Sequence, residues 1–230
     1  MTIFEINALF LSIKIGLQST LFILLPGIFV GWILAKKSFF GKTILDSIVH
    51  LPLVIPPIGV GYILLIMFGK NGLIGSFLFE NFNINLSFSW VGAAIACSVM
   101  SFPLMVRPIR VLMEAQDRRI DEAARTLGAS ELKIFLSITL PLAYPGILAG
   151  LVLSFARSIG EFGATIAFVG NIPGETQTLP LALWTLIETS NNSNEIIRLG
   201  LISVCLSLVA LLIANNIEKK FLDKLKNKKN

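Results

Sequence analysis

The strongest constraint on the fold is a series of apolar runs, each long enough to cross a lipid bilayer. A membrane helix needs about 20 mostly apolar residues, and such runs recur along all 230 residues of the chain. Because 54% of the residues are hydrophobic and only 14% are charged, a single soluble core would not cover this apolar surface. We therefore predict an all-α membrane protein. Its five expected spans are residues 15–35, 48–68, 89–106, 134–155 and 197–217.

The stretch between the last two spans, residues 159–194, is too polar to cross the membrane. It is rich in glycine, proline and amide side chains, and its apolar piece, residues 179–187, is much shorter than a span. Irregular backbone is tolerated at membrane depth only where protein or a water-filled cavity surrounds it. We predict a re-entrant or membrane-surface segment here.

The basic residues predict the orientation, because cytoplasmic loops carry an excess of lysine and arginine. With five crossings and the N-terminus outside, fifteen of the nineteen basic residues fall on one side. The loop of residues 107–133 and the lysine-rich tail of residues 219–230 are then cytoplasmic. The transmembrane domain comprises residues 1–218, and residues 159–194 face outward.

The cytoplasmic loop contains a predicted helix over residues 117–129, which are mostly strong helix formers. Asp117 is suited to cap its start, and Gly128 is suited to end it in a left-handed turn. Periodicity alone leaves open whether this helix lies on the membrane surface or binds a partner. Its small and apolar face consists of Ile120, Ala123, Ala124 and Leu127.

The spacing around this helix resembles the coupling loop of permease subunits of bacterial ABC import systems. Glu122-Ala123-Ala124 is followed after three residues by Gly128, and after nine more by Ile138-x-Leu140-Pro141. The resemblance implies the type I importer permease fold. It also implies that the helix docks into a cleft of a separate ATPase subunit, whose closure on ATP moves the membrane helices. The residues that match the motif are Glu122, Ala123, Ala124, Gly128, Ile138 and Pro141.

Two further strings are similar to the permeases of molybdate ABC importers, and the similarity extends over nearly the whole chain. They are LPLVIPPIGVGYILLIMFGKNGLIG, residues 51–75, and SIGEFGATIAFVGNIPGETQTLP, residues 158–180. The resemblance implies import of molybdate, or of the closely related tungstate, across a bacterial inner membrane. The implied partners are a second copy of the chain, two cytoplasmic ATP-binding subunits and an external molybdate-binding protein. Sulfate and thiosulfate permeases, which differ around residues 162–168 and 175–179, are the alternative.

The outer end of the fourth span carries the candidate residues of the transport pathway. Arg157 and Glu161 are four residues apart, which favours an ion pair across one helical turn over direct contact with the substrate. Because an anion held in a dense basic cage would not be released, we expect the pathway to offer hydroxyls, amides and helix ends. The candidates are Ser158, Gly160, Glu161, Phe162, Gly163 and Thr165, with Asn171, Thr176 and Thr178 as further polar groups.

Other classes of function fit the sequence poorly. One histidine, His50, and no HExxH motif leave no base or ligand set for an intramembrane enzyme. An ion-driven carrier needs ionisable groups in mid-span, whereas Asp46, His50 and Glu161 lie near the ends of apolar runs. Cys97 and Cys205 are expected to be buried packing residues.

Partners other than those implied by the resemblance also fit poorly. The basic residues lie where membrane topology places them, so no nucleic acid is expected as a partner. The sequence lacks a phosphate-binding loop. We therefore expect no catalytic residue, metal or cofactor in this chain, and ATP to be used by the partner subunit.

Overall fold

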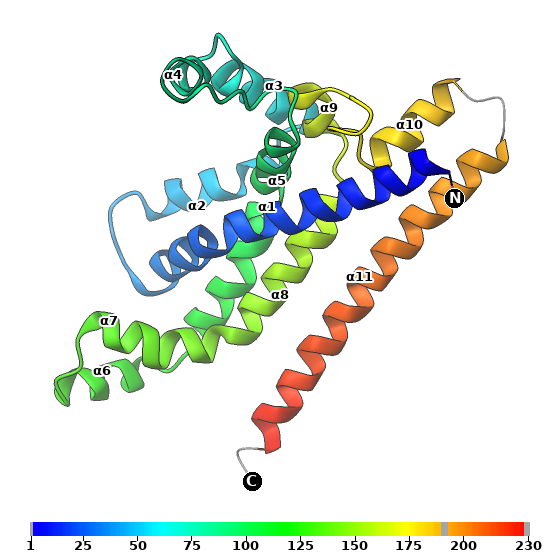
Figure 1. Cartoon of the computed structure of the whole chain (residues 1–230). Helices are drawn as coiled ribbons and strands as arrows, with labels where there is room; N and C mark the ends of the chain where they lie inside the picture. Colours follow the sequence, from blue (N-terminus) through cyan, green and yellow to red (C-terminus); the bar gives the residue numbers. More distant parts are fainter. Residues whose placement is uncertain (1, 190–192, 228–230) are drawn as a thin grey trace.

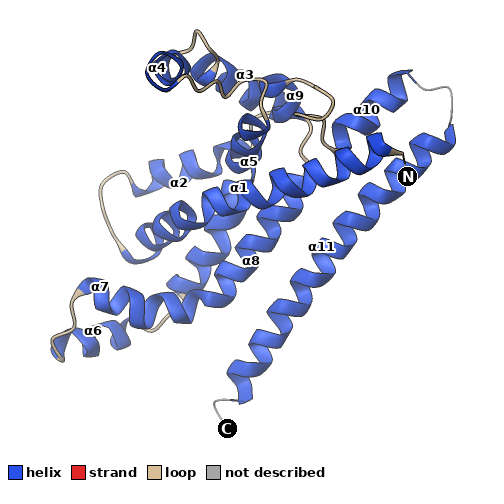
Figure 2. Cartoon of the chain, viewed as in Figure 1, coloured by secondary structure: helices blue, strands red, loops and turns tan. Residues whose placement is uncertain are grey.

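The computed structural model describes residues 2–189 and 193–227, which form helices joined by short loops (Figures 1 and 2). Within these residues, four helical segments are long and apolar enough to cross a membrane, and a bent pair of helices makes a fifth. The prediction of an all-α protein with about five spans is therefore confirmed. The four segments are α1 (Ile3–Lys36), α5 (Trp90–Glu114), the run Glu131–Ile159, and Ser193–Ile213 within α11 (Ser193–Asn227).

The second span, which we predicted as one helix over residues 48–68, is instead sharply bent. α2 (Lys42–His50) continues into a 3₁₀ turn (Leu51–Leu53), and α3 (Pro57–Phe68) then leaves at 109°. The cause is the Pro56-Pro57 pair. A proline disfavours the helical conformation of the residue before it, and Pro56 accordingly has ψ 131°.

The other spans are longer than their apolar runs. α1 begins at Ile3 because Thr2 and Glu5 form a reciprocal cap, in which the Thr2 N–H donates to the Glu5 carboxylate at 2.8 Å. α5 continues beyond the predicted end at residue 106, as far as Glu114. α11 reaches Asn227, so most of the predicted tail of residues 219–230 is helical, and residues 228–230 lie outside the described residues.

The fourth span contains a π-helical turn. It starts as α7 (Glu131–Ile134), passes through the π turn (Phe135–Thr139) and continues as α8 (Leu140–Ile159). The wide turn ends two residues before Pro141, which has no N–H to donate to the preceding turn. The helix thus accommodates its proline by widening, so the span stays continuous.

α5 packs along both α1 and α8. Two glycines of α8 bring its backbone against that of α5. A Cβ on Gly146 would lie 2.6 Å from the Pro108 carbonyl oxygen, and one on Gly150 would lie 2.9 Å from the Met105 carbonyl oxygen. The Gly146-x3-Gly150 pair therefore lets α5 and α8 pack closely, as small residues four apart do in membrane helices.

α11 packs against α8 and α10 (Leu179–Thr189), and Arg198 near its start pairs with the buried Glu5 at 2.7 Å. Many of its large apolar side chains, such as Leu201 and Leu208, remain exposed. Cys205, predicted to be buried, is exposed on this helix, whereas Cys97 on α5 is buried. The prediction for Cys205 was wrong because an apolar run that faces lipid looks the same in sequence as one that faces protein.

Short helices gather at the two ends of the bundle (Figure 1). α6 (Arg118–Thr126) and α7 lie at one end, while α3, α4 (Leu73–Phe82), α9 (Gly163–Val169) and α10 lie at the other. α10, with 11 residues, is too short to span, as predicted for this piece. α4 and α9 were not predicted as separate helices. α8, about 30 Å long at 1.5 Å per residue, connects the two ends.

Candidate functional site

α6, the helix of the motif, is closed at both ends by its own residues. The Asp117 carboxylate accepts a hydrogen bond from the Arg119 N–H at 2.9 Å. At the other end Gly128 has φ +82°, and the Ala129 N–H donates to the Ala124 carbonyl at 3.0 Å. α6 is therefore a short element with defined ends, as Asp117 and Gly128 predicted.

α6 turns its apolar side chains outward and a carboxylate inward. Leu127, the residue that follows the last turn of α6, is 88% exposed and Ile120 is 46% exposed, while Asp121 is buried. The motif residues on this helix differ in exposure: Glu122 and Ala123 are exposed and Ala124 is half-buried. A helix that packs only on its own chain places its apolar side inward. The reversed arrangement leaves an apolar surface that the described part of the chain does not cover.

The buried carboxylate of Asp121 pairs with the last residue of α1. Lys36 Nζ and Asp121 Oδ2 are 2.9 Å apart, and their side chains are only 12% and 10% exposed. Close by, Glu131 accepts a hydrogen bond from Arg125 at 2.6 Å, and this contact raises the pKa of the Arg125 guanidinium. The charged side chains surround a cavity of about 200 Å³ between α1, α6 and α7.

The last two residues of the motif lie apart from α6. Ile138 is half-buried in the π turn, and Pro141 is exposed in the first turn of α8. Gln116, which precedes α6, donates to the Thr139 carbonyl in the same π turn at 3.0 Å. The motif therefore marks two places, the helix α6 and the widened turn that leads into α8.

Sequence reasoning missed Lys36, Asp121 and Gln116. In the sequence Lys36 is one of the basic residues that predict the orientation, and Asp121 lies within the predicted helix of residues 117–129. The sequence offers one indication for Asp121. It lies in the first turn of α6, where acidic residues are favoured.

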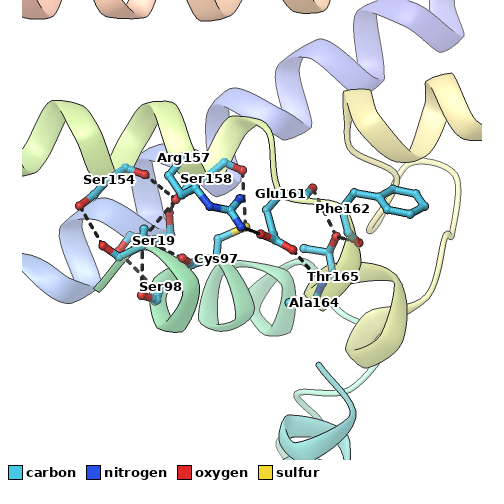
Figure 3. Close-up of polar contacts among 11 residues, drawn as sticks. Ser19, Cys97, Ser98, Ser154, Arg157, Ser158, Glu161, Phe162, Ala164 and Thr165 are labelled. Atoms are coloured by element: carbon cyan, nitrogen blue, oxygen red, sulfur yellow. Dashed lines mark hydrogen bonds and ion pairs between the residues drawn. The ribbon is translucent and has the colours of Figure 1, made fainter. Parts of the chain in front are cut away.

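At the far end of α8, the predicted ion pair is present. Arg157 Nη2 lies 2.7 Å from Glu161 Oε2, with side chains 29% and 1% exposed (Figure 3). The other carboxylate oxygen of Glu161 accepts the Ala164 N–H at 2.7 Å, at the start of α9. Glu161 thus fixes the turn between α8 and α9, and Arg157 keeps an accessible surface.

Ser158 belongs to a buried hydroxyl cluster between α1, α5 and α8 (Figure 3). Its Oγ accepts a hydrogen bond from Ser19 at 2.9 Å and donates to the Ser154 carbonyl at 2.8 Å. Ser98 donates to the Ser19 carbonyl at 3.1 Å, and Ser101 lies 3.5 Å from Ser158. Ser158 therefore joins three helices inside the protomer.

The remaining pathway candidates lie around the start of α9. The Thr165 hydroxyl is fully buried and donates to the Phe162 carbonyl at 2.9 Å. The Phe162 ring lies 5.6 Å from the Trp184 ring of α10. Gly163 is half-buried and packs against the start of α3, whereas Gly160 is exposed. The structure thus brings the six candidates into one segment, in which Ser158, Glu161 and Thr165 are buried and Gly160 reaches the surface.

The loop that leads to α10 is exposed at residues 172–174 and buried at residues 176–178. Asn171 donates to the Thr185 hydroxyl at 2.8 Å, and the Thr176 hydroxyl accepts the Ile172 N–H at 2.9 Å. Thr178 is buried as well. Within the described ranges, no group of three or more His, Cys, Asp or Glu side chains is arranged to hold a metal ion.

Comparison with known proteins places these features in a family. The family described as "Binding-protein-dependent transport system inner membrane component" matches residues 27–223. The molybdenum transport system permease protein ModB of Haemophilus influenzae is 49% identical over 221 residues, 96% of this chain and 96% of that protein. The sulfate transport system permease protein CysT of Salmonella typhimurium is 34% identical over 195 residues, 85% of this chain and 70% of that protein.

Solved structures share the fold. The crystal structure of a bacterial ABC transporter involved in the import of the acidic polysaccharide alginate covers 96% of this chain and 80% of its own, with a TM-score of 0.76 and 16% sequence identity. The expected importer permease fold is therefore confirmed. From its sequence, its helices and these relatives together, the chain belongs to the family of inner membrane components of binding-protein-dependent transport systems.

Proposed function

We propose that this chain is the membrane permease of an ATP-driven importer of molybdate. The observation that carries the coupling part of the proposal is the reversed polarity of α6, whose Leu127 is 88% exposed while Asp121 is buried. An exposed apolar surface on a helix with closed ends is suited to a partner protein. The partner is a separate ATPase subunit, and the chain itself has no catalytic role and binds no cofactor.

Movement of α6 reaches the far end of the bundle through α8. The ATPase closes on ATP and displaces α6, with Glu122, Ala123 and Ala124 at the docking surface. Gln116 ties the start of α6 to the π turn at Thr139 with a 3.0 Å hydrogen bond. α8 then carries the displacement over about 30 Å to the segment of residues 158–165.

The cargo is assigned as molybdate from the relatives. The ModB protein named above is 49% identical over nearly the full length of both chains. The CysT sulfate permease is more distant, at 34% identity over a smaller share of its own length. Sulfate or thiosulfate is therefore the second candidate, and tungstate is grouped with molybdate because the two oxyanions are so similar.

The cargo passes between two copies of the chain, beside residues 158–165. In this segment Gly160 is exposed and Phe162 is half-buried. Ser158, Glu161 and Thr165 are buried and fix the backbone around them through hydrogen bonds. Arg157 is neutralised by Glu161 at 2.7 Å. A paired cation presents less net charge to a passing oxyanion than a free one, so the anion is not held too tightly to leave.

The complete importer has two permeases, two ATP-binding subunits and an external molybdate-binding protein. It lies in the inner membrane of a bacterium, with α6 and the C-terminus in the cytoplasm and the N-terminus outside. The excess of lysine and arginine beside α6 and along the end of α11 supports this orientation.

The test is the ATPase activity of the whole complex in lipid, with its binding protein and with molybdate, tungstate or sulfate added separately. We expect molybdate and tungstate to stimulate hydrolysis and sulfate to leave it at the basal rate. Omission of the binding protein is the control, and it should abolish the stimulation. Stimulation by sulfate alone would reassign the cargo, and no stimulation by any oxyanion would contradict the proposal.

A further inference from the structure

The coupling helix α6 is attached to the bundle by a contact that is far from it in sequence. Lys36 and Asp121 are 85 residues apart, and Lys36 is the last residue of α1. The covalent connections of α6 lead to α5 on one side and α7 on the other. The ion pair adds a third connection, from α6 to α1.

Burial makes this pair different from the exposed ion pair beside it. Lys36 Nζ lies 2.9 Å from Asp121, with both side chains close to nine-tenths buried. Lys37 lies 3.5 Å from Glu131, with side chains 46% and 52% exposed. An exposed pair contributes little because water and salt screen it, whereas removal of one partner of a buried pair leaves an uncompensated charge. α6 and the end of α1 are therefore held together firmly.

α1 in turn reaches the segment that we place beside the transport route. Ser19 lies 17 residues before Lys36, about 25 Å along the helix. Its hydroxyl donates to Ser158 Oγ of α8 at 2.9 Å (Figure 3). Ser158 is three residues before Glu161, which fixes the start of α9. α1 and α8 thus both connect α6 with the segment around Ser158. α1 is linked to α6 by the Lys36 ion pair, and α8 is linked to it covalently through α7 and the π turn.

We propose that α6 drives α1 through the Lys36–Asp121 ion pair, so that α1 and α8 move as one unit during the transport cycle. Lys36 and Asp121 are positioning residues, since neither is assigned a contact with the cargo or the nucleotide. The inference rests on the proposed function of α6 as the coupling helix. It extends that function by naming a second helix that receives the movement and the contact that transmits it.

The first experiment measures the number of molybdate ions imported per ATP hydrolysed by the whole complex in proteoliposomes. Lys36→Met and Asp121→Asn should each lower this ratio by about 5-fold or more, the lower range of measured coupling energies, while ATP hydrolysis continues. The exchanged pair Lys36→Asp with Asp121→Lys should restore most of the ratio. Lys37→Met is the matched control, and it should keep the ratio of the unaltered complex because Lys37 is exposed.

The ratio separates coupling from stability, since loss of folded complex lowers import and hydrolysis in proportion. An unchanged ratio in both single variants overturns the inference. The inference also fails if the single variants lower the ratio and the exchanged pair does not restore it. The effect would then not come from the pairing of opposite charges. An unaltered complex that hydrolyses ATP but imports no molybdate contradicts the proposed cargo instead.

A second experiment tests the inference without any cargo. Spin labels at Phe29 of α1 and Leu142 of α8, both exposed, report the distance between the two helices after Cys205→Ser removes the exposed native thiol. We expect ATP to leave this distance unchanged in the complex with the native ion pair and to change it in Asp121→Asn. The same response to ATP in both complexes overturns the inference.

Discussion

Truncation of Leu127 tests whether α6 is a docking surface. Its side chain is 88% exposed in the isolated protomer, so almost all of its area is available to a partner. Full burial of a leucine side chain contributes about 1.5–3 kcal/mol. Leu127→Ala keeps the Cβ atom, so the loss on docking should be about 1–2 kcal/mol, which weakens binding of the ATPase subunit by about 5- to 30-fold.

The same change should leave the permease itself intact. Substitutions at exposed sites away from special contacts shift stability by about 0.5 kcal/mol or less, so the melting temperature should stay unchanged. Binding is measured by titration of the ATPase subunit onto the permease in lipid nanodiscs, with variant and unaltered protein in parallel.

Leu73 supplies the matched control. It is 86% exposed and lies on α4, at the opposite end of the bundle from α6. Leu73→Ala should therefore bind the ATPase subunit as tightly as the unaltered protein. If Leu127→Ala and Leu73→Ala bind equally well, the outward apolar face of α6 is not the docking surface and the reasoning fails.

Three further substitutions test the packing and the two ends of the bundle. Gly146→Ala places a Cβ 2.6 Å from a carbonyl of α5, so the helices must part by about 0.8 Å (3.4 − 2.6) to reach ordinary contact. We expect the free energy of unfolding to fall by about 1–3 kcal/mol, seen as a lower melting temperature in detergent. Gly200→Ala is the control, and it should keep the melting temperature because the space around Gly200 is open. Gly128→Ala forces alanine to φ +82°, a strain of about 1–2 kcal/mol, and should speed hydrogen exchange at the end of α6. Glu161→Gln removes the negative charge that pairs with Arg157 at 2.7 Å. An unchanged melting temperature would contradict the expected loss of about 1–3 kcal/mol of unfolding free energy.

The number of spans could be predicted because bilayer thickness fixes the length of an apolar run. The ends of the helices could not, since caps outside the apolar run determine them. Thr2 and Glu5 start α1 twelve residues before the predicted span, at Ile3 rather than residue 15. The bend at Pro56 was not placed either, because a proline in a membrane helix is compatible with a kink, a wide turn or a break. Pro141 produces the wide turn and Pro57 the break.

The sequence motif predicted the position of α6 and its caps. It did not predict which side of the helix is buried. Hydrophobic periodicity assumes that apolar side chains face the chain's own core. α6 does the opposite, since Ile120 is exposed and Asp121 is buried. The surroundings of Ser158 were equally hidden. They depend on Ser19 and Ser101, which are 139 and 57 residues away, and no local pattern reports such contacts.

The bend between α2 and α3 limits which side of the protomer can face lipid. Pro56 and Pro57 carry no N–H, so the carbonyls of Pro52 and Leu53 receive no hydrogen bond of the ordinary helical kind. A bare carbonyl in hydrocarbon costs several kcal/mol, which is why broken helices occur where protein or water supplies a donor. The side of the protomer that carries the Pro52 and Leu53 carbonyls should therefore face water or a neighbouring chain. Lipid tails should contact other parts of the surface.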